Sequence, residues 1–273
     1  MEDVTFVCEE CGKRITFAGN RRGHIETCPE CSSYVDVPDG AVAASALPEE
    51  TPTTPRTRRE LWIEVLAVLC LAYFPYMLYA IAVATGWHSA DCPFVYDSVS
   101  RIIESLQVIA PLLVILALSK DRWATFGIVR FGWLADVGGG LVLWSLALAV
   151  YYLVASLLPR WTDYASGRHS QGIAEGCLTL VVCVVAASTE ELVMRGYLIA
   201  RLEHLLGSTW QAVAVSTAIF ASYHVYQGSG GVIGAVVLGL VYAVWFCLFR
   251  RLWPICLAHA ANNFVAISSY GWS

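Results

Sequence analysis

Residues 181–200, VVCVVAASTEELVMRGYLIA, decide how this chain is interpreted. They form an apolar run long enough for a membrane-spanning helix, yet the run contains Glu190, Glu191 and Arg195. An ionised side chain at the centre of a spanning helix costs about 2.5 to 3.5 kcal/mol on insertion scales, so the three together cost roughly 8 to 10 kcal/mol. The whole stability of a typical fold is only about 5 to 15 kcal/mol. Ionisable groups kept at such a cost indicate a functional site.

The composition predicts an all-α polytopic membrane protein. Of the 273 residues, 57% are hydrophobic and only 14% are charged, which excludes an ordinary soluble globule. About seven transmembrane helices are expected, at residues 61–84, 99–119, 134–158, 178–200, 209–226, 231–249 and 253–270. Alternate loops carry most of the basic residues, namely Lys120, Arg122, Arg130, Arg201, Arg250 and Arg251. This pattern predicts a cytosolic N-terminus and an external C-terminus in the cytoplasmic membrane.

A separate hydrophilic unit precedes the apolar part of the chain. Its four cysteines, Cys8, Cys11, Cys28 and Cys31, form two C-x2-C pairs with the spacing of a zinc ribbon. Four thiolates around a structural Zn2+ would supply folding energy that so short a segment cannot obtain from an apolar core. Disulfide pairing is the alternative, but no secretory signal indicates an oxidising compartment. We therefore expect a small β-type zinc ribbon at residues 1–37, a Pro- and Thr-rich linker at 38–60, and a transmembrane domain at 61–273.

The balance of acidic and basic residues in the ribbon indicates which kind of partner it can bind. Acidic residues accompany the basic ones throughout this segment, so nucleic acid is not an expected ligand. The ribbon is instead expected to be a solvated module that contacts a cytosolic protein or serves regulation.

Helical spacing sorts the polar residues of the apolar segments into faces. Residues four apart share a face, which pairs Glu191 with Arg195, Phe220 with His224, and His259 with Asn263. Glu190 diverges from Glu191 by about 100° and is free to face a cavity, and Asn262 diverges from Asn263 by the same angle. A carboxylate with a histidine can activate water, and an imidazole with an amide can hold the oxyanion formed when water attacks a carbonyl. The spacing thus predicts one hydrolytic pocket shared by three helices.

These three groups resemble the EExxxR, FxxxH and HxxxN motifs of the CaaX protease and bacteriocin-processing (CPBP) family, which are membrane-embedded glutamic endopeptidases. The resemblance covers about residues 173–270 and rests on all three motifs in the same order. It implies that Glu190 and His224 activate water and that His259 and Asn263 form the oxyanion site, without a metal ion there. Glu191, Arg195 and Phe220 would support them. The implied substrate is a membrane protein, a peptide or a lipidated protein in the bilayer.

Two alternatives stay open. One is a non-proteolytic membrane receptor or scaffold that uses the ribbon as a recruiting module. The other is a zinc-dependent intramembrane metalloprotease with Glu190, His224 and His259 as ligands.

The depth of the residues in the membrane sets a condition for the leading hypothesis, in which the cavity is expected to open to the cytosol. Glu190 and His224 can meet only if the helix that carries Glu190 continues through Gly196 to about Ala200. A helix that ended earlier would leave Glu190 at the cytosolic edge, away from His224.

Overall fold

The computed structural model describes residues 3–8, 13–30, 34–38, 57–86, 93–119, 121–158 and 170–270. Its N-terminal part consists of two antiparallel strand pairs. The first joins β1 (Val4–Val7) to β2 (Arg14–Phe17), and the second joins β3 (Ile25–Thr27) to β4 (Tyr34–Asp36). A short 3-10 helix, η1 (Gly19–Arg21), lies between the two pairs in the sequence.

Two of the four ribbon cysteines can be placed. Cys8 directly follows β1 and Cys28 directly follows β3, and both are fully buried in one small apolar cluster with strand residues. Cys11 and Cys31 lie outside the described residues. The structure therefore shows two small sheets at the predicted position, and the zinc site stays a prediction.

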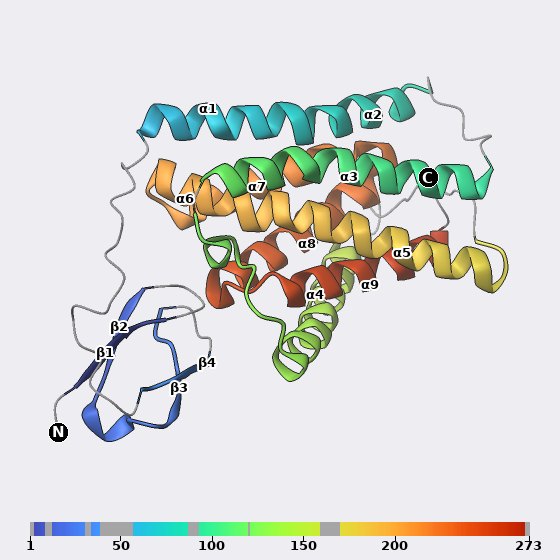
Figure 1. Ribbon diagram of the computed structural model, residues 1–273. Helices are drawn as coiled ribbons and strands as arrows, with labels where there is room; N and C mark the ends of the chain where they lie inside the picture. The colour runs from blue at the N-terminus through green and yellow to red at the C-terminus, as the bar shows by residue number, and fades with distance from the viewer. Residues whose placement is uncertain are drawn as a thin grey trace.

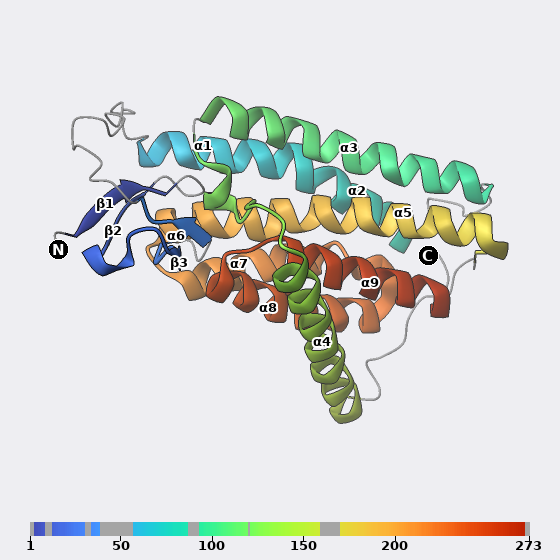
Figure 2. The ribbon, with the colours of Figure 1, turned by 60° about the horizontal axis from the view of Figure 1, so that its bottom comes forward.

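The rest of the described chain is helical (Figure 1). Its elements are α1 (Arg58–Val68), η3 (Leu69–Tyr73), α2 (Phe74–Ala84), α3 (Phe94–Ser119), η4 (Trp123–Phe126), η5 (Trp133–Val137), α4 (Gly138–Leu157), α5 (Gly172–Glu191), η7 (Leu192–Ile199), α6 (Ala200–Leu206), α7 (Thr209–Ser222), η8 (Val225–Gln227), α8 (Gly228–Phe249) and α9 (Trp253–Tyr270). α5 runs through the middle of the bundle and packs against α3 on one side and α9 on the other. Figure 2 shows α4 crossing α9 at a steep angle.

The first transmembrane helix begins earlier than predicted. α1 starts at Arg58, inside the stretch assigned to the linker, because Thr57 and Glu60 form a capping box that satisfies the first free amides of the helix. Residues 39–56, which make up most of the predicted linker, lie outside the described residues.

Five helical stretches of the described residues are long and apolar enough to cross a membrane. They are Arg58–Ala84, Phe94–Ser119, Trp133–Leu157, Gly172–Leu206 and Val225–Phe249. The chain is thus a polytopic, mostly helical membrane protein, but the expected number of about seven spans is too high by this measure. The two other expected spans exist as helices: α7 has 14 residues, fewer than the roughly 20 that a span needs, and α9 carries His259, Asn262 and Asn263 along its length.

The helix that carries Glu190 is continuous from Gly172 to Leu206, which confirms that it extends well past Arg195. α5, η7 and α6 form this single rod. Its middle part, η7, is π-helical over eight residues, and all eight are buried. Widened turns of this kind occur frequently at functional sites, and the regular helical spacing used in the sequence analysis did not predict this one.

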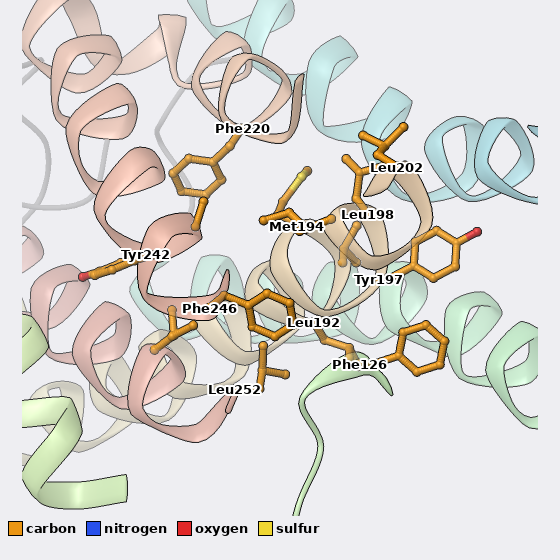
Figure 3. Close-up of a cluster of buried hydrophobic side chains, with 14 of the residues drawn as sticks. Phe126, Leu192, Met194, Tyr197, Leu198, Leu202, Phe220, Tyr242, Phe246 and Leu252 are labelled. Atoms are coloured by element: carbon orange, nitrogen blue, oxygen red, sulfur yellow. The ribbon is translucent and has the colours of Figure 1, made fainter. Parts of the chain in front are cut away.

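The apolar core packs around η7 (Figure 3). Leu192 lies near Phe246, and Tyr197 stacks on Phe126 with 6.3 Å between ring centroids. Gly196 permits this close packing, because a Cβ at that position would lie only 2.8 Å from the Phe126 carbonyl oxygen. The η4 turn therefore rests directly on the backbone of the helix that carries the first motif.

Arginines gather where several helix ends meet, and we call this region the arginine-rich end. The contacts join Arg58 to the Leu205 carbonyl, Arg201 to Glu64 and Asp121, Arg250 to Glu203, and Arg251 to Asp136. They bring together the start of α1, the end of α3, the end of α6 and the end of α8. Arg201, Arg250 and Arg251, three of the basic residues on which the topology prediction rests, thus share one end of the bundle.

Candidate active site

The motif residues line one cavity inside the helical bundle. The cavity has a volume of about 200 Å³. Its wall includes Glu190 of α5, Phe220 of α7, His224 between α7 and η8, and His259 and Asn263 of α9. The structure thus brings together the carboxylate, the two imidazoles and the amide that the sequence singled out.

Glu191 and Arg195 form a fully buried ion pair. Arg195 Nη1 donates to Glu191 Oε1 over 2.9 Å, and the two side chains are 1% and 0% exposed. His259 Nδ1 lies 2.6 Å from the same Glu191 oxygen. One carboxylate oxygen therefore joins α5 to α9. The pair at four-residue spacing was predicted, whereas the link to His259 follows from no spacing rule.

Aromatic rings enclose the guanidinium of Arg195. Its Cζ lies 4.2 Å from the centre of the Phe220 ring and 5.8 Å from that of Tyr242. An arginine over an aromatic face is attracted by the negative charge of the ring face. The Phe220 ring also contacts the His224 ring, with 4.7 Å between centroids. Phe220 therefore packs against both the buried cation and a cavity histidine, which gives the FxxxH motif a structural role.

Hydrogen bonds at Nδ1 orient both histidines. His224 Nδ1 lies 2.7 Å from the Phe220 carbonyl oxygen, an acceptor, so Nδ1 carries the proton and Nε2 is left for the cavity. His259 Nδ1 faces the Glu191 carboxylate and carries a proton for the same reason. His259 Nε2 lies 3.8 Å from Glu190 Oε2, which is too long for a direct hydrogen bond but short enough for charge attraction.

Asn262 and Asn263 both contribute to the cavity wall. The angle of about 100° between these neighbours thus does not keep Asn262 out of the wall. Two consecutive residues of α9 can border the same space because the cavity continues along this helix to Ala266 and Ile267.

Part of the cavity wall comes from helices that the motifs do not reach. Tyr76 and Tyr79 of α2 and Arg101 and Glu104 of α3 all line the cavity. None of the three motifs includes any of these four residues. Arg101 and Glu104 did carry a signal, because charged residues near the start of an expected span are the same kind of anomaly that exposed the first motif.

The grouping of potential metal ligands bears on the zinc-protease alternative. Within the part of the chain that the structure describes, no three His, Cys, Asp or Glu side chains are grouped so that they could hold a metal ion. Glu190, His224 and His259, the ligands of that alternative, all belong to the described part and are not among such a group. This result does not bear on the ribbon, because Cys11 and Cys31 are outside the described residues.

Comparison with protein families agrees with this geometry. Residues 174–265 match the family model of the type II CAAX prenyl endopeptidases, described as Rce1-like. This part of the chain is therefore similar to that protease family. The matched stretch is about a third of the chain and contains all three motifs. No curated protein and no solved structure gave a significant match.

The Rce1-like region supports the resemblance to the CPBP proteases and an integral membrane protein. It includes every cavity residue of α5, α7 and α8, and of α9 it includes His259, Asn262 and Asn263. The cavity residues of α2 and α3 lie outside it, as do the ribbon and the linker. The polar wall that these two helices add is therefore a feature of this chain that the family match does not describe.

Proposed function

We propose that this protein is an intramembrane glutamic endopeptidase that hydrolyses a peptide bond with water activated by Glu190 and His224. The observation that carries the proposal is the convergence of Glu190, His224, His259 and Asn263 on one cavity within a helical membrane protein. The Rce1-like match adds that the region belongs with a protease family.

The water-activating step uses two groups that lack a proton where water would bind. His224 is bonded through Nδ1, so Nε2 offers a lone pair to the cavity, and the Glu190 carboxylate offers its oxygens. Water held between them attacks the carbonyl carbon of the substrate and passes its proton to Glu190. Glu190 then delivers that proton to the departing amine as the C–N bond breaks. The enzyme returns to its starting state without a covalent intermediate.

The oxyanion is held from the α9 side of the cavity. His259 can donate from Nε2 only when both ring nitrogens are protonated, and its Nδ1 is held by the Glu191 carboxylate. The amide of Asn263 is the second donor. With His259 protonated, the charges of Glu190, Glu191, Arg195 and His259 sum to zero. A neutral set of this kind lowers the cost of keeping four ionised groups inside the membrane.

The substrate is proposed to be a membrane-associated or lipidated polypeptide. The cavity lies within the spanning helices, and its wall combines the catalytic polar groups with apolar residues such as Val182, Ala186 and Leu238. A peptide segment already held at the bilayer reaches such a site without crossing bulk water.

The proposal is tested by comparing the proteins of membranes that contain the parent enzyme with membranes that contain Glu190→Gln. New cleavage products are expected only with the parent. Glu175→Gln is the matched control, because this carboxylate lies on the same helix but outside the cavity, where its oxygen accepts a bond from the Gln171 amide. Undiminished cleavage by Glu190→Gln would refute the role assigned to Glu190. Full cellular function of that variant without any cleavage would favour the scaffold alternative.

We also propose that Cys8, Cys11, Cys28 and Cys31 hold a structural Zn2+ and that the ribbon contacts a cytosolic protein. The burial of Cys8 and Cys28 in one cluster, each directly after a strand, supports this arrangement. Thiolates are the ligands that structural zinc prefers. The ion would stabilise the small sheets and has no part in the proposed hydrolysis.

A further inference from the structure

The cavity extends from the middle of the bundle away from the arginine-rich end. Because the π-helical turns of η7 rise less than the 1.5 Å per residue of an α-helix, Glu190 lies at most about 16 Å along its helix from Arg201, and Val182 at most about 28 Å. On α3, Arg101 lies about 27 Å from Ser119, where the helix reaches the arginine-rich end. The hydrocarbon core of a bilayer is about 30 Å thick. Glu190 is therefore placed near the middle of the membrane, and Val182 and Arg101 near its opposite boundary.

The cavity residues of the other helices also lie in the middle of the bundle or farther from the arginine-rich end. Tyr79 lies about 31 Å from Arg58 along α1 and α2. α9 starts at the arginine-rich end, and His259 lies about 9 Å and Ile267 about 21 Å from its first residue, Trp253. Among the lining residues that the structure describes, none belongs to η7 or α6, the parts of the central rod nearest the arginines.

Packed side chains close the cavity toward the arginine-rich end. Figure 3 shows Leu192, Phe246 and Leu252 close together in the core cluster that also contains Phe126 of η4, and each of them is 5% exposed or less. Tyr242 and Phe126 are fully buried in the same cluster. Packing of this density leaves no path for a peptide, because protein interiors contain few voids larger than a water molecule.

The far end of the cavity is polar instead. Gln227 Nε2 donates to the Tyr226 hydroxyl over 2.9 Å, and the Tyr226 ring packs edge-on against Tyr79. Arg101 Nε pairs with Asp97 over 3.0 Å, and these two side chains are 20% and 32% exposed. Tyrosine is typical of the membrane interface, and a long arginine side chain near a helix end reaches it readily. A rim of this composition suits a mouth that is open to water.

We propose that the cavity is entered from the membrane face opposite to the arginine-rich end, through a mouth rimmed by Tyr79, Arg101, Tyr226 and Gln227. The ribbon joins α1 at Arg58 through a linker without an apolar span, so the ribbon lies on the arginine side. The distribution of basic residues places that side in the cytosol. The substrates are then membrane-anchored segments whose scissile bond reaches the site from the extracytoplasmic side. This assignment replaces the expectation of a cavity open to the cytosol, and its substrate class rests on the proposed protease function.

Cysteine labelling of the full-length protein tests the position of the mouth without any need for activity. Gln227→Cys reports on the rim, Gln171→Cys on the exposed start of α5, and His204→Cys on the exposed surface of α6. Spheroplasts are treated with a membrane-impermeant maleimide, and labelled peptides are identified by mass spectrometry, which separates each new cysteine from the native ones. Gln227→Cys and Gln171→Cys are expected to react in intact spheroplasts, and His204→Cys only after the membrane is opened.

Each other result overturns a stated part of the inference. Reaction of His204→Cys alone in intact spheroplasts would reverse the orientation. Labelling of Gln227→Cys from the same side as His204→Cys would place the mouth at the arginine-rich end. A Gln227→Cys side chain that reacts only after denaturation would mean that no open mouth exists at this rim.

The cleavage sites provide a second readout. Sites found with the parent enzyme and absent with Glu190→Gln are expected in segments on the extracytoplasmic side of their substrates. Cleavage confined to cytosolic segments would overturn the proposed mouth while it supports the protease function. If the cysteines are labelled as expected but no membrane shows cleavage, the proposed mouth is supported and the protease function is contradicted. The two outcomes can be separated because the labelling does not depend on Glu190.

Discussion

The ion pair of Glu191 and Arg195 allows a quantitative test of the charge arrangement at the site. Glu191→Gln leaves the Arg195 guanidinium buried without an ionised partner, and Arg195→Met leaves the carboxylate with His259 alone. Removing one partner of a buried pair costs about 3 to 5 kcal/mol in the free energy of unfolding, whereas neutral groups at both positions are often tolerated. The double variant is therefore expected to recover most of what either single variant loses.

The loss of stability in each variant is measured by thermal unfolding of the purified proteins in detergent. A change of 1 kcal/mol shifts Tm by about 2 to 4 °C in chains of 150 to 250 residues, so each single variant is expected to melt roughly 6 to 20 °C below the parent. The double variant should melt within a few degrees of the parent. If its loss equals the sum of the two single losses, Glu191 and Arg195 are not coupled and the reasoning is refuted.

A second pair on α3 supplies the control for burial. Asp97 and Arg101 have the same four-residue spacing and an almost equal distance of 3.0 Å, but their side chains are 32% and 20% exposed. Partly exposed pairs contribute about 0.2 to 1 kcal/mol, so Asp97→Asn should lower Tm by only a few degrees. Equal losses in Asp97→Asn and Glu191→Gln would show that burial does not set the cost.

Three further predictions concern the oxyanion site, the helix packing and the ribbon. Asn263→Ala is expected to lower kcat by about 10²- to 10³-fold because it removes an oxyanion donor. Asn262→Ala, on the same cavity wall, should lower kcat far less. Equal losses of kcat in a peptide-cleavage assay would contradict the role assigned to Asn263. Gly196→Ala should destabilise the protein by about 1 to 3 kcal/mol, because the new Cβ would lie 2.8 Å from a backbone oxygen. Gly176→Ala is its control: a Cβ there meets nothing within 4 Å, so this variant should be neutral or stabilising in the same unfolding assay. Cys28→Ser is expected to remove the zinc ion that elemental analysis should find in the purified full-length protein, and zinc that persists in the variant would place a metal site elsewhere.

Regular helical spacing was sufficient to predict contacts within one helix. Glu191 and Arg195 are a pair because four residues return to the same face, and the requirement that the helix extend past Arg195 followed from depth alone. The fold class could also be predicted, because a chain of such apolar composition has few alternatives to membrane-spanning helices. Five rather than about seven stretches of the described residues meet the length and hydropathy of a span, and α7, although apolar, has only 14 residues.

Contacts between helices were not predictable in this way. His259 and Glu191 are 68 residues apart, and no periodicity relates α9 to α5. The polar wall from α2 and α3 was missed for the same reason, because Arg101 belongs to no motif that would connect it to Glu190. The hydrophobic pattern also did not predict that η7 is π-helical, because its mostly apolar residues would suit a regular buried α-helix equally well.

Glu190 and Glu191 are neighbours in the sequence, yet the structure predicts opposite effects on stability when each is replaced. Glu191 is fully buried and bonded to both Arg195 and His259, so its carboxylate stabilises the fold and orients a histidine of the site. Glu190 is 13% exposed, faces the cavity, and lies 3.8 Å from its nearest cationic candidate. A carboxylate inside the membrane whose cationic neighbour lies beyond hydrogen-bond distance is compensated less than a directly bonded one, and residues kept for activity commonly cost stability. Glu190→Gln should therefore abolish cleavage while it preserves or raises Tm, and Glu191→Gln should lower both. A loss of Tm in Glu190→Gln as large as that in Glu191→Gln would mean that both glutamates are structural, and the proposed division between catalysis and support would be wrong.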